Sequence, residues 1–459
     1  MYYTQENYDK IYEYVLKLPV VDTHEHLPMD EEHRNMGSDI IFEYLSHYIT
    51  VDLVSSGLSP ELIQKAKDPY LGIEERWSII DPFYKMCRHT GYARAIEIAV
   101  RDIYGVGGIR METVAHLNTQ FQKNLKPGHF RRVLKDMCNI ETSILDAFGG
   151  GYACDREFFN RVWQPVEFVT PHGDFLDIKE CYKGKYNIDI KTIDDWTEIF
   201  VNELEEALKG EIAALKFPTA YERSLHFKNV DYSTANELFQ DIVRKSTIKG
   251  ERFIQNTDVQ DYMMHFVLSE ANKRGLTVQI HTGLLEGNGN TLKNSDPQKL
   301  NNLFLTYPNV KFDIFHIGYP YYMELCALAK MFPNVYIDMC WAHIISPNAA
   351  RNALSEFLDT MAYNKISAFG GDYIFVDGVY GHLMIARENV SKVLAAKMTE
   401  SFRSRTDSRC DAGNYRCRRV DSRDSRPEDR TQHRPPFGVI KPEYAQPYSV
   451  IWKSAGCPQ

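Results

Sequence analysis

The sequence predicts an α/β fold: a (β/α)8 barrel of the TIM type with a helical insertion after its first strand. Three observations predict it: short apolar runs rich in β-branched residues, amphipathic helical segments between most of them, and polar residues that end several runs. The eight runs are residues 20–23, 140–145, 162–169, 212–217, 277–280, 310–315, 335–339 and 366–369. A doubly wound sheet is the competing fold, but no glycine-rich phosphate-binding motif follows the first run.

The chain opens with a predicted lead-in helix over residues 4–18, where apolar side chains recur at helical spacing before Pro19. After the first strand, the segment from about residue 30 to 135 contains four helical patterns, at residues 40–48, 60–67, 73–89 and 92–104. This stretch is far longer than one connection between a strand and the next. We therefore interpret it as a helical cap, which either closes over a pocket or serves as a structural annex.

Later helices are predicted between the remaining strands, at residues 194–208, 258–273, 297–305, 321–331, 346–361 and 382–396. The chain then changes character, because residues 398–437 contain ten arginines and no lysine. We predict one barrel domain over 1–397 and an atypical arginine-rich tail over 398–459. The tail is a disordered segment, a basic interaction arm or sequence read in a shifted frame, and no function is assigned to it.

Composition excludes several classes of function. A net charge of −9 gives no basic footprint for nucleic acid, and no apolar run is long enough to span a membrane. The nine cysteines are scattered without a Cys-x-x-Cys pair, which excludes a zinc ribbon or a thioredoxin-like site. The first residues lack the pattern of a signal peptide. We therefore expect a cytoplasmic protein with reduced thiols.

Residues with metal-binding chemistry end five of the eight predicted strands. Two histidines separated by one residue point to the same face of a β-strand, so their imidazoles can converge on one ion. The carboxyl ends of all strands in a parallel barrel face one rim, where active sites lie. Six candidate side chains are therefore expected together at this end of the barrel: His24, His26, Lys216, His281, His316 and Asp372.

Four histidines and a carboxylate suit Zn²⁺, with Mn²⁺ or Fe²⁺ as alternatives. Such an ion would lower the pKa of a bound water from about 15.7 toward about 7, which makes hydroxide available at neutral pH. Asp372 is suited to two tasks, as a metal ligand and as a proton shuttle. The pattern indicates metal-assisted attack on a carbonyl or a related carbon.

Residues 20–395 resemble the amidohydrolase superfamily. The resemblance is carried by Val21-Asp22-Thr23-His24-Glu25-His26, Ala214-Leu215-Lys216, Ile280-His281-Thr282-Gly283, Phe315-His316-Ile317-Gly318 and Asp372. The pattern is similar to the amidohydrolase-related branch, which includes the domain fused to glutamine synthetase in some fungal and plant proteins. Decarboxylases and uronate isomerases are more distant relatives.

The resemblance implies a distorted barrel with one or two divalent metals. His24, His26 and Asp372 would bind the first metal, and His281 and His316 would bind a metal or the substrate. His316 and Asp372 are the expected catalytic pair.

Lys216 has three open roles: a carboxylated metal ligand, a cation that binds a substrate carboxylate, or a lysine that only extends to water. Four further residues follow strands at the same rim and are predicted to contact substrate: Tyr221, Arg223, Trp341 and His343. Arg223 could fork onto a carboxylate, although an arginine on a loop is often only solvated.

We therefore predict a metal-dependent hydrolase that cleaves a C–N or C–O bond of a small carbonyl-containing substrate. A non-hydrolytic decarboxylase or a uronate-isomerase-like enzyme on the same site is the first alternative, and a catalytically silent barrel used as a binding module is the second. The expected partner is a small-molecule substrate, without nucleic acid or membrane; association into a homo-oligomer is left open. Zn²⁺ is the preferred cofactor.

Overall fold

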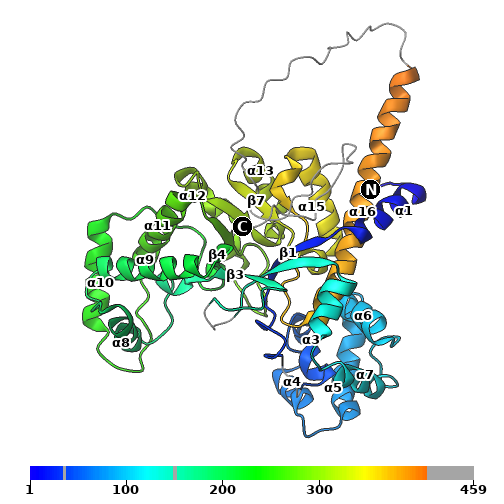
Figure 1. The fold of residues 1–459 in the computed structure, drawn as a ribbon, viewed down its shortest axis with the longest axis horizontal. Helices are drawn as coiled ribbons and strands as arrows, with labels where there is room; N and C mark the ends of the chain where they lie inside the picture. Colours follow the sequence, from blue (N-terminus) through cyan, green and yellow to red (C-terminus); the bar gives the residue numbers. More distant parts are fainter. Residues whose placement is uncertain (35–37, 148–151, 411–459) are drawn as a thin grey trace.

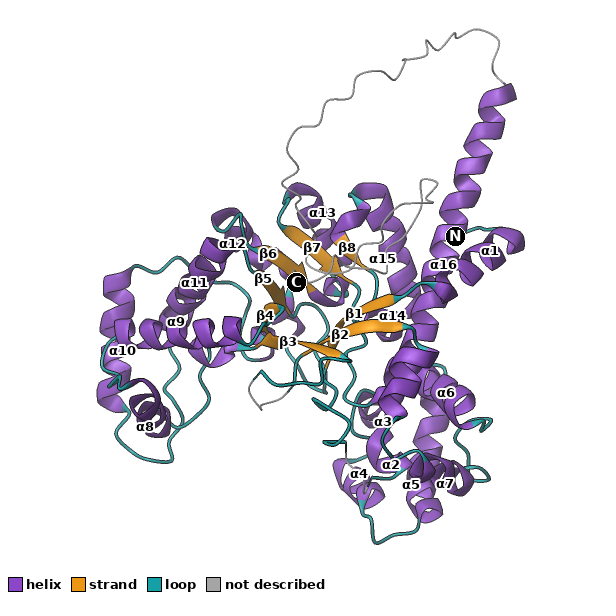
Figure 2. Cartoon of the chain, viewed as in Figure 1, coloured by secondary structure: helices purple, strands orange, loops and turns teal. Residues whose placement is uncertain are grey.

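The computed structural model describes residues 1–34, 38–147 and 152–410, with side chains through residue 400. Its centre is one sheet of eight parallel strands that pair in chain order (Figures 1 and 2). The strands are β1 (Val20–Glu25), β2 (Ile140–Leu145), β3 (Phe159–Trp163), β4 (Ala214–Phe217), β5 (Thr277–Ile280), β6 (Lys311–Ile314), β7 (Val335–Asp338) and β8 (Ile366–Ser367).

Backbone hydrogen bonds bring the two edges of the sheet together. The amide of Thr23 donates to Phe369 O, and the amide of Asp372 donates to His24 O. The sheet therefore forms a nearly closed barrel, which confirms the predicted fold class. The third strand lies earlier than its apolar run predicts, because Pro165 has no amide hydrogen to offer a sheet and starts the 3₁₀ helix Pro165–Phe168 instead.

Helices surround the barrel, and most begin with a side-chain cap. Thr192 and Asp195, for example, form a reciprocal capping box at the start of α9. The helices outside the cap are α1 (Gln5–Lys17), α8 (Phe175–Tyr186), α9 (Ile193–Lys209), α10 (Tyr232–Lys245), α11 (Thr257–Arg274), α12 (Asn301–Thr306), α13 (Tyr322–Met331), α14 (Ala342–Ile345), α15 (Pro347–Thr360) and α16 (Val376–Cys410). Helix α16 passes the predicted domain boundary at 397, and the rest of the predicted tail lies outside the described residues.

The predicted helical cap follows β1, as expected. Its helices are α2 (Ile40–Tyr44), α3 (Ile49–Ser55), α4 (Pro60–Lys67), α5 (Ile73–Cys87), α6 (Gly91–Tyr104), α7 (Val114–Lys123) and the π-helix Arg131–Met137. The helix predicted over 40–48 ends at Tyr44, and a separate helix, α3, begins at Ile49. The cap and helices α8 to α11 form two separate lobes beside the barrel (Figure 1).

The cap is fastened to the barrel through a buried carboxylate. Asp377, in the first turn of α16, accepts hydrogen bonds from His129 Nε2 at 2.8 Å, Tyr104 Oη at 2.5 Å and Tyr44 Oη at 3.2 Å. All three donors belong to the segment inserted after β1. Because β8 leads into α16, this contact ties the cap to the end of the last strand.

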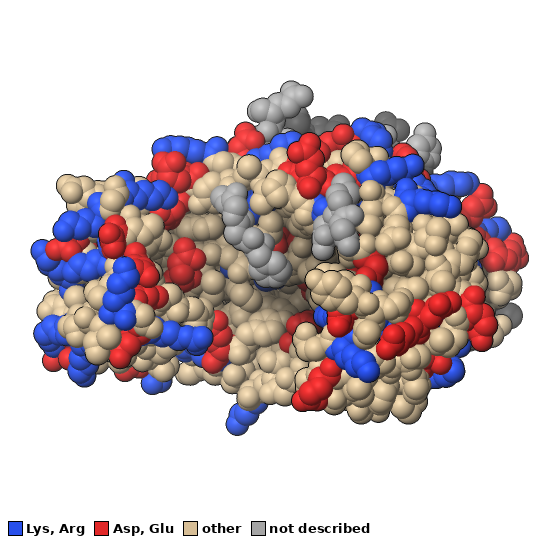
Figure 3. Space-filling model, turned by 90° about the horizontal axis from the view of Figure 1, so that it is seen from below, with Lys and Arg blue, Asp and Glu red and all other residues tan. Residues whose placement is uncertain are grey.

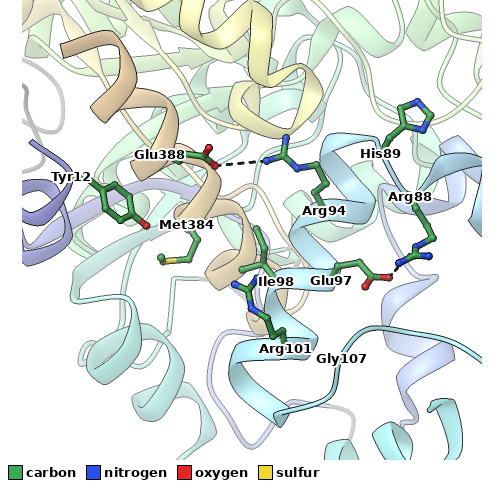
Figure 4. A pocket seen from close by; sticks show the side chains of 10 residues that line it. All are labelled: Tyr12, Arg88, His89, Arg94, Glu97, Ile98, Arg101, Gly107, Met384 and Glu388. Atoms are coloured by element: carbon green, nitrogen blue, oxygen red, sulfur yellow. Dashed lines mark ion pairs between the residues drawn. The ribbon is translucent and has the colours of Figure 1, made fainter. Parts of the chain in front are cut away.

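Two hollows are visible outside the packed core. The face in Figure 3 is hollowed between the two helical lobes, and its charged residues gather mainly on the outer parts of those lobes. A second cleft, of about 710 Å³, lies between α1, α6 and α16 (Figure 4). Ion pairs line this cleft, Arg94 with Glu388 and Arg88 with Glu97, each at 3.7 Å. It contains none of the predicted site residues and marks the seam where the cap meets α1 and α16.

In the described part of the chain, no helix is both long and apolar enough to cross a bilayer. The six cysteines whose side chains the structure describes are free thiols.

Candidate metal centre

The two histidines of the first strand converge, as predicted. Strand β1 is extended through Glu25, and the amide of His26 continues its hydrogen bonding by donating to Tyr373 O at 2.9 Å. Residues two apart on such a backbone share a face. The Nε2 atoms of His24 and His26 are accordingly 3.3 Å apart.

Asp372 completes a group of three donors. Its backbone has a left-handed φ of 58°, and Tyr48 Oη of the cap donates to its carbonyl oxygen at 2.6 Å. Its Oδ1 is 3.3 Å from His26 Nε2 and 3.6 Å from His24 Nε2. Three ligands of a tetrahedral ion with bonds of about 2.0 Å would lie about 3.3 Å apart. The spacing of these atoms therefore fits one divalent metal ion.

The hydrogen bonds of the rings fix which nitrogens offer lone pairs. Carbonyl oxygens only accept, so the ring nitrogen beside each of them carries the proton. His26 Nδ1 donates to Asp146 O at 2.7 Å, which leaves its Nε2 as the acceptor facing His24 and Asp372. This is the arrangement that orients metal-binding histidines in proteins.

His281 and His316 follow the same logic. His316 Nδ1 donates to Cys340 O at 3.0 Å, and His281 Nε2 donates to Leu284 O at 2.9 Å. The remaining nitrogens, His316 Nε2 and His281 Nδ1, face each other at 3.1 Å. Two lone pairs do not form a hydrogen bond, so this pair also fits a shared cation or proton. His316 Nε2 is 3.9 Å from Asp372 Oδ2.

Burial keeps three of the four histidines neutral. It lowers the pKa of His24 and His281 well below the usual value, with Lys216 acting in the same direction. It also lowers the pKa of His316 to about 4. For Asp372, burial acts to raise the pKa, but the contacts with His26 and the other histidines lower it well below the usual value. Neutral imidazoles and an ionised carboxylate are the forms that bind metals.

Lys216, at the carboxyl end of β4, is 3% exposed and does not extend to water. Its Nζ lies 3.1 Å from His24 Nε2 and 4.0 Å from the centre of the Phe315 ring. Within the described part of the chain, no carboxylate forms an ion pair with it. The His24 lone pair can serve either the lysine or a metal, so metal binding requires Lys216 to turn away or to change its chemical state.

Two of the four residues predicted to contact substrate lie beside this group. The ring of Tyr221 is 4.8 Å from that of His281, and its hydroxyl accepts the Glu286 amide at 2.9 Å. The ring of Trp341 is 5.1 Å from that of His316.

The other two point elsewhere. Arg223 pairs with the buried Asp261 at 2.5 Å and its guanidinium lies over the Phe227 ring. His343 donates from Nε2 to Ala368 O and packs near His382, behind β8. Both contacts are internal, so the structure does not bring either side chain to the group of histidines.

The sequence analysis did not select three residues that the structure brings to the centre. Asp146 and Cys340 directly follow the predicted second and seventh strands, and the strand-end rule could have found both. Asp146 groups with His24 and His26, whereas Cys340 groups with His316 and Asp372; in each group the potential ligand atoms lie within 4.8 Å of one another. Tyr48 comes from the cap, and no sequence signal marks it.

The fold and these donors define the class: a (β/α)8 barrel with a candidate divalent-metal centre at the carboxyl ends of its strands. Comparison with known proteins shows what the chain is similar to. Residues 254–400 match the family model described as Amidohydrolase. The chain is also 26% identical over 164 residues to Protein fluG of Emericella nidulans, a match that spans 34% of this chain and 19% of that protein. The predicted resemblance to the amidohydrolases is thus confirmed.

Solved structures show the same fold. A uronate isomerase from Thermotoga maritima superposes with a TM-score of 0.71 at 17% identity, over 87% of this chain and 92% of that one. A protein from Lactobacillus casei described as a metal-dependent hydrolase gives a TM-score of 0.55 at 16% identity, over 84% and 89%. At these identities the likeness concerns the fold alone.

Proposed function

We propose that this chain is a metal-dependent hydrolase that cleaves a C–N or C–O bond of a small carbonyl-containing substrate. The observation that carries the proposal is the convergence of His24 Nε2, His26 Nε2 and Asp372 Oδ1 at distances of 3.3 to 3.6 Å, the spacing of ligands around one ion. The match of residues 254–400 to the amidohydrolases supports it.

The residues present fit a divalent ion, with Zn²⁺ preferred and Mn²⁺ or Fe²⁺ as alternatives. His24, His26 and Asp372 would hold the first ion, and His281 with His316 would hold a second ion or the substrate. When bound, such an ion activates water and polarises a carbonyl group. The carboxylated and substrate-binding roles of Lys216 both remain part of the proposal.

Asp372 has the position expected of a proton shuttle. Its Oδ1 faces His24 and His26, while its Oδ2 faces His316. One carboxylate can therefore hold an ion with one oxygen and accept a proton from the attacking water with the other. His316, a neutral base held by Cys340 O, stands next to Oδ2 and can pass that proton on to the leaving group.

Rim residues would bind the substrate and exclude water. Trp341 and Tyr221 lie in the segments that follow β7 and β4, and their rings contact His316 and His281, where they would present aromatic surface to a small molecule. A small-molecule substrate and a cytoplasmic location are part of the same proposal.

The test uses the purified protein, stripped of metal by a chelator and then reloaded with Zn²⁺ or Mn²⁺. Turnover is followed in ¹⁸O-water on a panel of small amides, esters and lactones. Loss of activity on stripping, recovery on reloading and incorporation of ¹⁸O into the product are expected. An ordered metal site without turnover on a broad panel would instead indicate a silent binding module.

A second candidate is non-hydrolytic chemistry at the same centre, either isomerisation of a uronate or decarboxylation. The isomerase form is included because a uronate isomerase from Thermotoga maritima shares this fold over 87% of the chain. Mass spectrometry of the product separates the candidates, because hydrolysis adds the mass of water, isomerisation leaves the mass unchanged and decarboxylation removes carbon dioxide.

A further inference from the structure

We propose that Asp146 is a fourth protein ligand of the metal position formed by His24, His26 and Asp372. This inference rests on the proposed metal-dependent function and extends it, because a second carboxylate changes the kind of ion that the centre prefers. Asp146 follows β2, outside the five strands that supply the six residues predicted for the metal site, and it is 2% exposed.

The carboxylate of Asp146 faces the same histidine as Asp372. Its Oδ2 lies 3.8 Å from His24 Nε2, against 3.6 Å for Asp372 Oδ1. The potential ligand atoms of His24, His26 and Asp146 all lie within 4.8 Å of one another. The 3.8 Å between Asp146 Oδ2 and His24 Nε2 allows one ion to bind both atoms at bonds of about 2.0 to 2.2 Å.

The backbone of Asp146 is locked to the first strand. Its amide donates to Glu25 O at 2.8 Å, and its carbonyl accepts from His26 Nδ1 at 2.7 Å. Both partners belong to the His24–His26 segment, so the carboxylate is held at a fixed place relative to the two imidazoles. The backbone carbonyl of Asp146 alone is enough to hold His26, so this support does not require a carboxylate at position 146.

A neighbouring strand orients the side chain. Gln164, directly after β3, donates from Nε2 to Asp146 Oδ2 at 2.5 Å. Ligating carboxylates are commonly fixed by a hydrogen bond of this kind. The carboxylate oxygen keeps a second lone pair for an ion, because Gln164 occupies only one.

Two carboxylates and two imidazoles make a harder ligand set than one carboxylate and two imidazoles. They also bring two negative charges, which neutralise a divalent ion. Oxygen ligands favour Mn²⁺ and Fe²⁺ relative to Zn²⁺. Asp146 should therefore strengthen Mn²⁺ binding by a larger factor than Zn²⁺ binding.

The experiment measures the dissociation constants of Zn²⁺ and Mn²⁺ by competition with a chromogenic chelator, on full-length wild-type protein and on Asp146→Asn. Asparagine keeps the size of the side chain and an oxygen for Gln164. Loss of a direct ligand should weaken Mn²⁺ binding by more than about 100-fold, beyond the range of outer-shell substitutions, and weaken Zn²⁺ binding by a smaller factor. A smaller change for Mn²⁺, or an equal change for both ions, overturns the proposal.

Asp136→Asn is the matched control, since it makes the same chemical change on an exposed residue of the π-helix before β2 and should leave both constants unchanged. Asp372→Asn distinguishes the two levels of the proposal. If wild-type protein binds no metal, the proposed function itself fails. If Asp372→Asn weakens binding and Asp146→Asn behaves like Asp136→Asn, only the role of Asp146 fails.

A second variant keeps the test decisive should Asp146→Asn not fold. Gln164→Leu leaves the carboxylate in place and removes the donor that orients it. It should weaken Mn²⁺ binding by about 10- to 100-fold, as expected for a partner of a ligand. An unchanged Mn²⁺ constant in this variant counts against Asp146 as a ligand.

Discussion

Replacing Asp377 by asparagine tests how the cap is held on the barrel. Burial acts to raise the pKa of this carboxyl group, but His129, Arg34 and Tyr104 outweigh it and lower the pKa from 3.8 to about 2. At about 1.36 kcal/mol for each tenfold change in proton affinity, this fall corresponds to about 2.4 kcal/mol of stability at neutral pH. The variant also weakens the hydrogen bonds from His129, Tyr44 and Tyr104.

We therefore expect Asp377→Asn to lower the free energy of unfolding by about 3 kcal/mol at pH 7, measured by urea denaturation. The pKa is lower in the folded than in the unfolded state, so the contribution is complete above about pH 4 and disappears as the pH falls toward 2. The difference between wild type and variant should stay constant from pH 7 to about 5 and shrink below about pH 4.

Asp136→Asn, on an exposed carboxylate, should change the free energy of unfolding by less than about 0.5 kcal/mol at any of these pH values. The reasoning is refuted if Asp377→Asn costs less than about 1 kcal/mol at pH 7, or if the cost is the same at pH 3 as at pH 7.

Three further predictions follow from single contacts. Tyr48→Phe removes the hydroxyl that holds the Asp372 carbonyl at 2.6 Å and should weaken metal binding by about 10-fold in a chelator titration, whereas Tyr92→Phe, on the ring stacked against Tyr48, should leave it unchanged. Gly371→Ala places a methyl group 1.7 Å from Glu25 Oε1 and should lower the free energy of unfolding by about 3 kcal/mol; a melting temperature equal to wild type would show that the two segments can separate. Arg223→Ala leaves the buried Asp261 without its arginine partner and should lower the free energy of unfolding by about 3 to 5 kcal/mol. The KM of the folded variant should be unchanged, and a raised KM would support the substrate role first predicted for Arg223.

The sequence was sufficient for the features that depend on local periodicity. Apolar runs located the strands, and the rule that parallel strands end at one rim placed His24, His26, His281, His316 and Asp372 together. The same rule would have added Asp146, which follows a correctly predicted strand.

Features set by the path of the chain after a strand were not predictable. His343 comes three residues after Cys340. Trp341 between them has a left-handed φ of 60° and caps the short helix α14, and this turn of the chain directs the imidazole to Ala368 O. The ion pair of Arg223 was not predictable either, because its partner Asp261 lies on α11, far along the chain. Tyr48 reaches Asp372 only through the folding of the cap.

The central claim is that side chains from separate strands hold one divalent ion. Its most direct test is metal analysis of the purified protein by inductively coupled plasma mass spectrometry, combined with anomalous diffraction from crystals grown with Mn²⁺ or Zn²⁺. The account predicts at least one bound ion per chain, with an anomalous peak within about 2.0 to 2.2 Å of His24, His26 and Asp372. Metal-free protein that takes up no ion from solution, or a peak away from these three residues, would contradict it.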